Sequence, residues 1–341
     1  RPEEARVYRL DGEECAVIVN DDVNVLRGAY AQLGGMFQRQ HDHEGRKFYC
    51  TRAGGIAQYP VDAETYESLV KYANYALEYA KGHGKKRCVN FSQPILAERV
   101  RELELMELLR DSVENGFKGF SLCYQPQVEA ATGRVVGAEA LARWRCDAYG
   151  DLSPLEFIPL LEESGLIVPM GTWVLQHAVD TCKRWRKAIP SFTMSVNLSY
   201  RQLDEEGLVP LIVDTLHEAG LPPDSLVVEM TESRFADDAQ ATHQLFDQLR
   251  MQGVRVAMDD FGTGYSSLGV LKTSPADIVK IDRAFIRDIQ TSTFDATFIK
   301  FVVELCHAVG ISVCLEGVET DAEYEVVGGM GLDYIQGFLF G

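Results

Sequence analysis

Polar and acidic residues stand at or near the ends of successive strand-like runs in the second half of this sequence. They are Glu139 in AEAL, Asn197 ending SVN, Glu229 ending VVE, Asp259 and Asp260 ending VAMDD, Lys280 ending IVK and Glu316 after VCL. In a barrel of alternating strands and helices, side chains at such positions converge on one mouth, where these folds carry out their chemistry. Converging carboxylates repel one another unless cations hold them, so the pattern predicts a metal site.

From Phe120 onward, strand-like and helix-like segments alternate as they do in an α/β barrel. The candidate strands are 120–129, 134–142, 193–198, 226–231, 255–260, 277–282, 312–316 and 334–340. Segments with helical apolar spacing include 172–187, 208–219, 239–252 and 296–309. Only Ala130 to Gly133 joins the first two strands, too short for a parallel crossover, so we expect an antiparallel first pair in an irregular eight-stranded barrel.

The charge and the cysteines narrow the classes of function. A formal charge of -18 argues against a broad face for nucleic-acid polymers, although a bound divalent metal would still allow a small anionic substrate. The eight cysteines are dispersed, with no pair at zinc-ligand or redox-motif spacing, and are read as free thiols in a reducing compartment.

The expected location is the cytoplasm. No apolar run approaches the span of a bilayer, and no signal peptide opens the chain. The chain begins abruptly at Arg1 and stops at Gly341 inside an apolar run, which suggests a fragment. It could therefore be the cytoplasmic part of a larger, membrane-attached or sensor protein.

We expect two domains, divided near residue 93, because 341 residues exceed a typical single domain. Residues 1–92 contain strand-like runs at Cys15–Val19 and Gly55–Gln58 and a helix-like segment at Tyr66–Lys81, which indicates part of a small α/β domain. The barrel, residues 93–341, is entered through a helix at about 94–115. This helix either packs on its own barrel or connects the domains for signalling, and periodicity alone reports only burial.

The motif EALARW places Glu139 and Arg143 four residues apart on one strand, and therefore on one face. In isolation this pair would be an ordinary ion pair. Here Asn197 in VNLS adds an amide oxygen, a ligand that hard divalent cations accept. EMTES supplies Glu229 and Glu232, of which only one can lie at the strand end, so the other should begin the following loop or helix.

The strongest single element is DDFGTGYSSL, residues 259–268. Adjacent carboxylates on a strand point to opposite faces, so holding Asp259 and Asp260 at one site requires the strand to end there, and Gly262 and Gly264 permit that turn. Paired aspartates bridging two metals would clamp the oxygens of a phosphodiester. A solvated Asp-rich turn would explain this pair alone, but not the polar residues on comparable strands.

Lys280, Glu316 and Gln336 complete the candidate set. Lys280 in KID could hold a nucleophilic water or a phosphoryl oxygen, and Glu316 in EGVE could act as base or as ligand. Gln336 in IQGFLFG lies at the last strand. Taken singly, each residue is more often an ordinary hydrogen-bond or ion-pair partner.

Eight motifs in order resemble the EAL family of cyclic di-GMP phosphodiesterases over roughly residues 100–341: EALARW, FIPLLEESGLI, VNLS, EMTES, DDFGTGYSSL, KID, EGVET and IQGF. The resemblance implies a modified (β/α)8 TIM-like barrel that binds two Mg²⁺ or Mn²⁺ ions per active site. It further implies hydrolysis of cyclic di-GMP to linear 5'-pGpG in bacterial second-messenger signalling, and a homodimer through the barrel.

The resemblance also implies a role for each matching residue. The metal ligands would be Glu139, Asn197, Glu229, Asp259, Asp260 and Glu316, with Glu316 alternatively the general base and Lys280 positioning the water. Arg143, Gln336 and, more weakly, Gln125 in YQPQ would face the substrate. Glu232 would anchor the DDFGTGYSSL loop, which in this family is thought to transmit dimer geometry to the metals.

The N-terminal part is similar to the second half of a GGDEF diguanylate cyclase domain. Asp11, Gly12, Glu13, Glu14 and Cys15 occupy the signature positions, and Asp11 places a carboxylate where a nucleotide should approach the backbone. Pro2 and Ala5 stand where a product-binding RxxD needs Arg and Asp. We therefore expect a structural or regulatory remnant, which could still bind GTP, and no cyclase.

Two functions from different classes remain. The first is a metal-dependent phosphodiesterase, favoured because the ligand set is intact. The alternative is a catalytically quiet receptor that binds cyclic di-GMP and relays its occupancy to a partner. Tight nucleotide binding without pGpG formation would favour the receptor.

Overall fold

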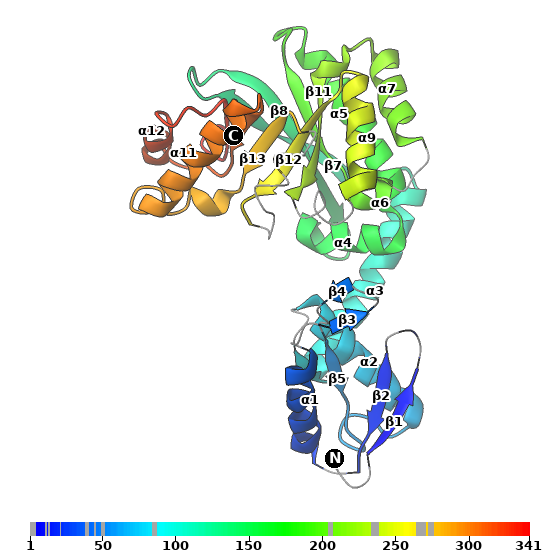
Figure 1. The fold of residues 1–341 in the computed structure, drawn as a ribbon. Helices are drawn as coiled ribbons and strands as arrows, with labels where there is room; N and C mark the ends of the chain where they lie inside the picture. Colours follow the sequence, from blue (N-terminus) through cyan, green and yellow to red (C-terminus); the bar gives the residue numbers. More distant parts are fainter. Residues whose placement is uncertain are drawn as a thin grey trace. The chain divides into compact units, whose positions relative to one another are not determined.

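The computed structural model describes residues 5–10, 12, 14–20, 22–37, 41–43, 46–48, 52–83, 87–203, 207–232, 239–263, 271 and 276–341. Pro2, Asp11, Glu13 and the stretch 264–268 lie outside these ranges, as does Cys50, one of the eight cysteines. The chain divides into two compact units, Arg1–Leu105 and Met106–Gly341. Figure 1 gives the labels of their helices and strands.

In the described ranges, unit 1 contains small sheets and, before the helix that continues into unit 2, two helices. Its elements are β1 (Arg6–Arg9), β2 (Cys15–Ile18), α1 (Val23–Phe37), β3 (His41–His43), β4 (Arg46–Phe48), β5 (Gly54–Ile56), α2 (Tyr66–Gly82) and β6 (Cys88–Asn90). Strands β5 and β6 pair in parallel, and a Cβ at Gly55 would lie 2.1 Å from the carbonyl oxygen of Ala73. Helix α2 therefore packs directly on the backbone of β5.

Helix α2 begins where the sequence supplies a cap. The side chain of Thr65 accepts a hydrogen bond from the backbone N–H of Ser68 at 3.2 Å, and the side chain of Ser68 accepts one from the backbone N–H of Thr65 at 3.4 Å, which satisfies groups at the helix start. Its inner face buries Ala76 beside Phe91, whose ring stacks on Tyr72 with centroids 4.2 Å apart. These contacts form a small apolar core for unit 1.

Helix α3 (Gln93–Glu114) contributes residues to both units. Ile95 near its start is buried in the core of unit 1. In unit 2, Leu109 is fully buried and Ser112 accepts a hydrogen bond from the indole N–H of Trp144 at 3.2 Å. The second half of α3 thus packs on its own barrel, and a signalling role stays a prediction.

Unit 2 is a closed barrel of eight strands with a ninth at its edge. Within the described ranges the strand order is β10-β11-β12-β13-β14-β15-β7-β8-β9, and β10 also pairs with β8, which closes the ring. The strands are β7 (Phe120–Glu129), β8 (Val135–Cys146), β9 (Gly150–Leu152), β10 (Thr193–Asn197), β11 (Leu226–Thr231), β12 (Arg255–Phe261), β13 (Ile278–Ile281), β14 (Ser312–Leu315) and β15 (Tyr334–Gln336).

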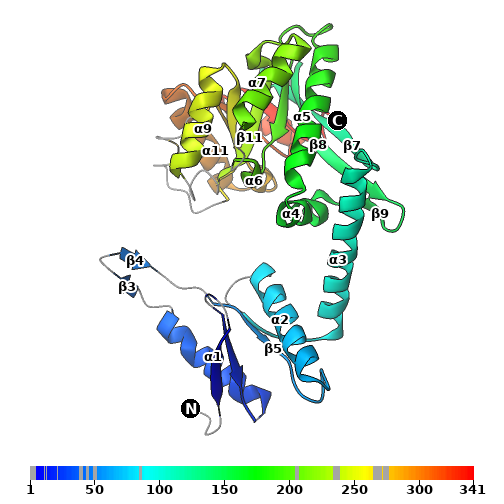
Figure 2. The same cartoon turned by 90° about the vertical axis from the view of Figure 1, so that its right-hand side faces the viewer.

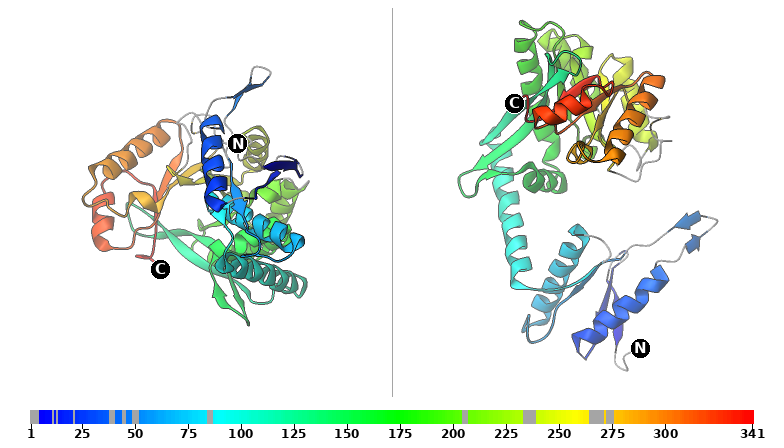
Figure 3. Two further views of the ribbon diagram at one scale, coloured as in Figure 1. Left: turned by 90° about the horizontal axis from the view of Figure 1, so that it is seen from below. Right: turned by 90° about the vertical axis from the view of Figure 1, so that its left-hand side faces the viewer.

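One strand of the barrel runs against its neighbours. Strand β7 pairs antiparallel with β8 and with β15, while the other barrel pairs are parallel. The expected antiparallel first pair and irregular barrel are confirmed. Figure 3 shows the C-terminus beside the β7–β8 hairpin, which β15 joins.

Helices follow the parallel strands and cover the barrel. They are α4 (Pro154–Ser164), α5 (Ile167–Trp185), α6 (Tyr200–Leu203), α7 (Leu208–Ala219), α9 (Ala239–Met251), α11 (Thr293–Ala308) and α12 (Asp321–Val327), with short 3-10 turns at Pro223–Ser225 and Arg283–Phe285. Figure 2 shows α5, α7 and α9 along the outside of the strands. No described helix is long and apolar enough to cross a bilayer.

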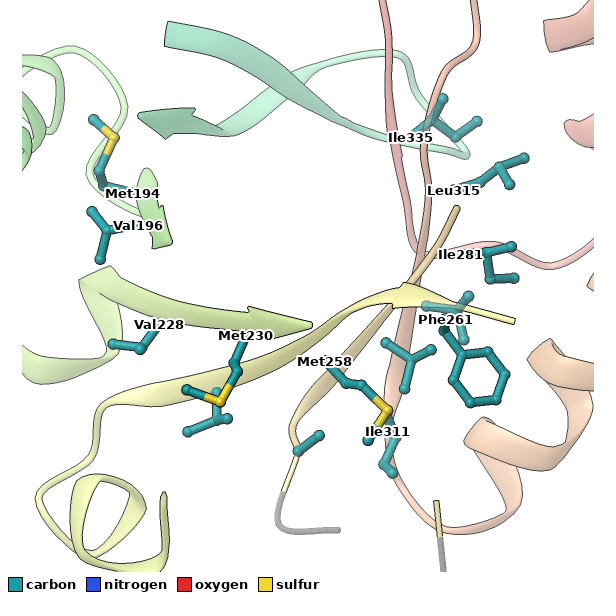
Figure 4. Packing of buried hydrophobic residues seen from close by; sticks show 14 of the residues in the cluster. Met194, Val196, Val228, Met230, Met258, Phe261, Ile281, Ile311, Leu315 and Ile335 are labelled. Atoms are coloured by element: carbon teal, nitrogen blue, oxygen red, sulfur yellow. The ribbon is translucent and has the colours of Figure 1, made fainter. Parts of the chain in front are cut away.

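The main core lies between the strands and these helices. Outward residues of successive strands pack with buried helix residues such as Ile212 on α7, Phe246 on α9 and Val302 on α11. Figure 4 shows outward strand residues of this core, among them Met194, Val196, Val228, Met230, Met258, Ile281, Leu315 and Ile335. The opposite face of each strand is left for the barrel interior, since strand side chains alternate with period two.

Candidate active site

The candidate residues form one row on the inner face of the barrel. Five times an apolar or aromatic strand residue precedes a candidate residue by two positions, and of these five candidates only Glu316 lies just past the end of its strand: Val227 and Glu229, Ala257 and Asp259, Ile278 and Lys280, Cys314 and Glu316, Tyr334 and Gln336. The first members of these pairs pack together as a separate small cluster. The polar row therefore rests on an apolar floor, near the carboxyl ends of the strands where barrels carry their chemistry.

Lys280 on β13 lies at the centre of the acidic residues. Its side chain is 1% exposed, and Nζ lies 2.6 Å from Glu229 Oε2, 2.6 Å from Glu316 Oε1, 3.0 Å from Glu139 Oε2 and 3.5 Å from Asp259 Oδ1. Burial acts to lower the pKa of Lys280, but the four surrounding carboxylates outweigh burial and hold that pKa well above its usual value. The lysine is therefore an ammonium ion.

Glu139 on β8 has a partner on each carboxylate oxygen. Its Oε1 accepts a hydrogen bond from Asn197 Nδ2 at 2.6 Å, and its Oε2 accepts from Gln336 Nε2 at 2.7 Å as well as from Lys280. Burial acts to raise the pKa of Glu139, but the Lys280 ammonium and these hydrogen bonds hold it below its usual value. The ion pair of Glu139 is with Lys280, whereas Arg143 donates to the carbonyl oxygen of Ala142 at 2.9 Å.

The paired aspartates meet for a reason different from the expected one. The expectation that the strand ends at Asp260 is wrong, because β12 continues through Phe261, which pairs with Ile281. Instead the register shifts between Met258 and Phe261, and Asp260 has a left-handed φ of 56°. This bulge turns Asp260 so that the two adjacent carboxylates share one site, although strand neighbours ordinarily face opposite ways.

Asp259, Asp260 and Glu316 offer a compact set of oxygen ligands. One carboxylate oxygen from each lies within 4.8 Å of the others. Burial, with the neighbouring Asp259 carboxylate, raises the pKa of Asp260 to about 6, and burial raises the pKa of Glu316 to about 7 despite the nearby Lys280. Because Lys280 offsets only one of several negative charges and hard divalent cations prefer oxygen ligands, the donor set fits such a cation.

Glu229 and Glu232 lie on either side of the end of strand β11, as expected from the sequence. Glu229 lies within β11 and is 1% exposed, whereas Glu232 follows the strand directly and is 2% exposed. Glu232 Oε2 accepts a hydrogen bond from the backbone N–H of Gly262 at 2.9 Å. It therefore contacts the start of the loop that it was expected to anchor; residues 264–270 of that loop lie outside the described ranges.

The three residues expected to face substrate differ in position. Gln125 on β7 and Arg143 on β8 are half-buried, and Gln336 on β15 is 2% exposed. Gln336 Nε2 also donates to Gln125 Oε1 at 2.8 Å. Their roles toward substrate stay predictions, and the structure adds a hydrogen bond from Gln336 to Glu139 that the sequence does not indicate.

Two further polar residues of the inner row were not predicted. Gln127 on β7 donates from Nε2 to Gln336 Oε1 at 3.0 Å and to Ser195 Oγ at 3.4 Å, and Ser195 on β10 is 1% exposed. The alternation of strand side chains could have indicated both residues, because Gln127 stands two residues after Gln125 and Ser195 stands two residues before Asn197.

The signature positions of unit 1 are described only in part. Gly12 has a left-handed φ of 49°, and Glu14 Oε1 lies 2.8 Å from Lys81 Nζ. Lys81 also pairs with Glu78 at 2.9 Å. The exposed Glu14 side chain is thus engaged by a lysine from α2.

Unit 2 is a closed α/β barrel in which acidic and amide side chains surround a buried lysine near the carboxyl ends of the strands. The fold and this group of side chains together define the class of barrel proteins to which the chain belongs. The chain belongs to the EAL domain family, which it matches over residues 106–341. Residues 1–87 match the family described as diguanylate cyclase, GGDEF domain. Both resemblances drawn from the motifs are therefore confirmed.

Two curated relatives of this chain are named as cyclic di-GMP phosphodiesterases, and one of them is named as a diguanylate cyclase as well. The bifunctional diguanylate cyclase/cyclic di-GMP phosphodiesterase MucR of Pseudomonas aeruginosa is 38% identical over 341 residues, 98% of this chain and 49% of MucR. The cyclic di-GMP phosphodiesterase NbdA of the same species is 34% identical over 98% of this chain and 43% of NbdA. The chain thus spans about half the length of the curated relatives it matches.

A solved structure supports the barrel. The PaMucR phosphodiesterase in its c-di-GMP complex is 39% identical, with a TM-score of 0.66, over 70% of this chain and 96% of that one. This match extends along nearly the whole of the solved chain, so the modified barrel is confirmed as an EAL fold.

Proposed function

We propose that this chain is a divalent-metal-dependent phosphodiesterase that hydrolyses cyclic di-GMP to linear 5'-pGpG. The observation that carries the proposal is the row of buried carboxylates. Their total negative charge exceeds the single positive charge of Lys280, which is their one ion-pair partner among the described residues. Support comes from the 39% identity to the PaMucR phosphodiesterase solved with c-di-GMP. A receptor that binds without cutting has no observation in its favour.

The metal would be Mg²⁺ or Mn²⁺, with two ions per site. Its proposed ligands are Glu139, Asn197, Glu229, Asp259, Asp260 and Glu316. Bound divalent cations would supply positive charge that offsets the anionic oxygens of a phosphodiester and would acidify water. All six residues offer oxygen atoms, the ligand type that these cations prefer.

The protein's own residues have distinct proposed tasks. Lys280 Nζ holds a water or a phosphoryl oxygen, because it is a buried ammonium at the centre of the site. Glu316, with its pKa raised to about 7, can take up a proton near neutral pH as general base, if it is not a ligand. Arg143 and Gln125 contact the substrate, and Glu232 anchors the loop after β12.

Replacement of Glu139 by alanine tests the function. Glu139→Ala is expected to abolish formation of pGpG, because Asn197, Gln336 and Lys280 all lose a shared partner. Product is measured by chromatography of cyclic di-GMP incubated with Mg²⁺ or Mn²⁺. The matched control is Glu319→Ala, an exposed glutamate of the same EGVE motif as Glu316, which should leave turnover unchanged.

The outcomes separate the two functions. Metal-dependent product that disappears in Glu139→Ala supports the enzyme, and equal turnover by that variant contradicts the assigned site. Binding of cyclic di-GMP with no product after long incubation would make the chain a receptor.

The setting of this activity is also proposed. We place the protein in the cytoplasm, since the described cysteines are free thiols and the compartment that keeps thiols reduced is cytosolic. We also propose that the chain forms a homodimer through the barrel and that its two domains divide at residue 93. The GGDEF remnant is proposed to bind GTP. No nucleic-acid polymer is expected as a partner of a chain with charge -18.

A further inference from the structure

The side-chain amide of Gln336 has a hydrogen-bond partner for every group it offers. Nε2 donates to Glu139 Oε2 at 2.7 Å and to Gln125 Oε1 at 2.8 Å, and Oε1 accepts from Gln127 Nε2 at 3.0 Å. A carboxylate can only accept, so the nitrogen end of this amide must face Glu139. The oxygen end then needs a donor, and Gln127 supplies it.

The strand register brings these side chains together. Gln336 on β15 lies opposite Gln127 on β7, and Gln125 lies opposite Glu139 on β8. Gln127 itself lies opposite Gly137, where an added Cβ would be 3.2 Å from Gln127 Oε1 and 2.6 Å from Thr193 Oγ1. The absence of a side chain at Gly137 therefore leaves the space that the Gln127 amide uses.

The orientation of the Gln336 amide has a consequence for Glu139. With its nitrogen toward Glu139, Gln336 and Lys280 both donate to Oε2, and Oε1 faces Asn197. If the amide turned over, its oxygen would face Oε2, and two buried acceptors would repel each other. Gln127 disfavours the reversed amide, because its Nε2 donor would then lose Gln336 Oε1 as acceptor.

We propose that Gln127 is a positioning residue, which acts through Gln336 to hold the Glu139 carboxylate in the orientation that binds metal. The inference rests on the proposed function and deepens it. Outer partners that orient a ligand commonly change metal affinity when they are removed. The hydrogen bonds described for Gln127 go to Gln336 and Ser195, so its effect must pass through another residue.

The test is a double-mutant cycle read by Mn²⁺ binding without nucleotide. Calorimetry on the full chain compares the parent protein with Gln127→Met, Gln336→Met and the double variant, each checked by its melting curve. Gln127→Leu is a second variant, in case methionine is not tolerated. The matched control is Gln176→Met, the same change at an exposed position on α5.

Gln127→Met is expected to weaken Mn²⁺ binding about tenfold, the lower end of the range for lost outer partners, while Gln176→Met leaves the affinity unchanged. The double variant should bind no more weakly than Gln336→Met, because coupled residues act through one interaction. Parental affinity in folded Gln127→Met and Gln127→Leu, or losses that simply multiply, would overturn the inference. If the parent protein bound no Mn²⁺, the proposed metal site would fall with it.

Discussion

Lys280 illustrates how one buried charge organises a group of acids. Four carboxylates lie within 3.5 Å of its Nζ, and the side chain is 1% exposed. Removing one member of a buried ion pair is costly because the other is left uncompensated. The surplus of negative charge that favours the charged form of Lys280 would also attract divalent cations.

Metal affinity should depend on pH because two proposed ligands have raised pKa values. Below about pH 6 to 7, protons occupy Asp260, with its pKa of about 6, and Glu316, with its pKa of about 7, and must leave when metal binds. Mn²⁺ affinity is therefore expected to fall roughly 10- to 100-fold from pH 8 to pH 5.5. Calorimetry in buffers of different ionisation enthalpy measures both the affinity and the protons released.

In the metal-free protein, the carboxyl groups of Asp260 and Glu316 make stability fall as pH rises, whereas metal affinity should increase. A carboxyl whose pKa is higher in the folded than in the unfolded state binds more protons when folded, so its contribution to stability declines as pH rises from about 4 to 7. The Asp260→Asn, Glu316→Gln variant is the control, and its melting temperature should depend less on pH. An Mn²⁺ affinity equal at pH 5.5 and pH 8 would contradict the prediction.

At the scale of single residues, the sequence indicates which residues end strand-like runs, but it does not indicate the contacts among them. Glu139, Glu229, Asp259, Lys280 and Glu316 could be selected because period two and strand ends are visible in the sequence. The Gln127–Gln336 hydrogen bond joins residues 209 positions apart. Such a contact depends on barrel closure and register, which no local pattern specifies.

Strand β12 is the element that departs most from its sequence pattern. Its bulge gives Asp260 a φ of 56°, and Gly262 follows with a φ of 99°. A Cβ at Gly262 would lie 2.6 Å from the ring of Phe285 and 2.9 Å from that of Phe298. Both the backbone angle and the packing of these two rings therefore require glycine.

Gly262→Ala is expected to weaken both folding and metal binding. Strain at the backbone angle alone costs roughly 1–3 kcal/mol, and the clash with Phe285 and Phe298 adds to it. Displacement of this segment would disturb the hydrogen bond from Gly262 to Glu232 and the two aspartates before it. Denaturant unfolding and Mn²⁺ titration are the measurements.

Gly310→Ala provides the matched control for that substitution. Gly310 also has a left-handed φ, 79°, but no atom lies within 4 Å of a Cβ added there. It should show backbone strain without a clash and without a change in Mn²⁺ affinity. If the two variants lost equal stability, packing on Phe285 and Phe298 would have no part in the effect.

At the scale of elements, the eight barrel strands could be predicted, since each is a short apolar run bounded by turn residues. The edge strand β9 at Gly150–Leu152 and the helix α4 at Pro154–Ser164 were not anticipated as elements. β9 has three residues, too few for a periodic signal. The β12 bulge could not be predicted, because no local pattern in the sequence marks the register shift between Met258 and Phe261.

For the whole molecule, the proposed ligands all lie in unit 2. They extend from Glu139 to Glu316, whereas unit 1 ends at Leu105. Residues 93–341 alone are therefore expected to bind Mn²⁺ and to form pGpG. A folded fragment without either property would contradict this. Comparing its turnover with that of the whole chain, with and without GTP, measures any tuning by residues 1–92, and equal rates throughout would exclude it.

The position of β7 between β8 and β15 has a consequence for biosynthesis. Strand β15 supplies Gln336 and pairs with β7, which left the ribosome some 200 residues earlier. Until β15 is made, Glu139 lacks its Gln336 partner and β7 has an open edge. A nascent chain therefore cannot assemble the complete site by folding its earlier strands first, so translation through the last strand also sets when the centre can form.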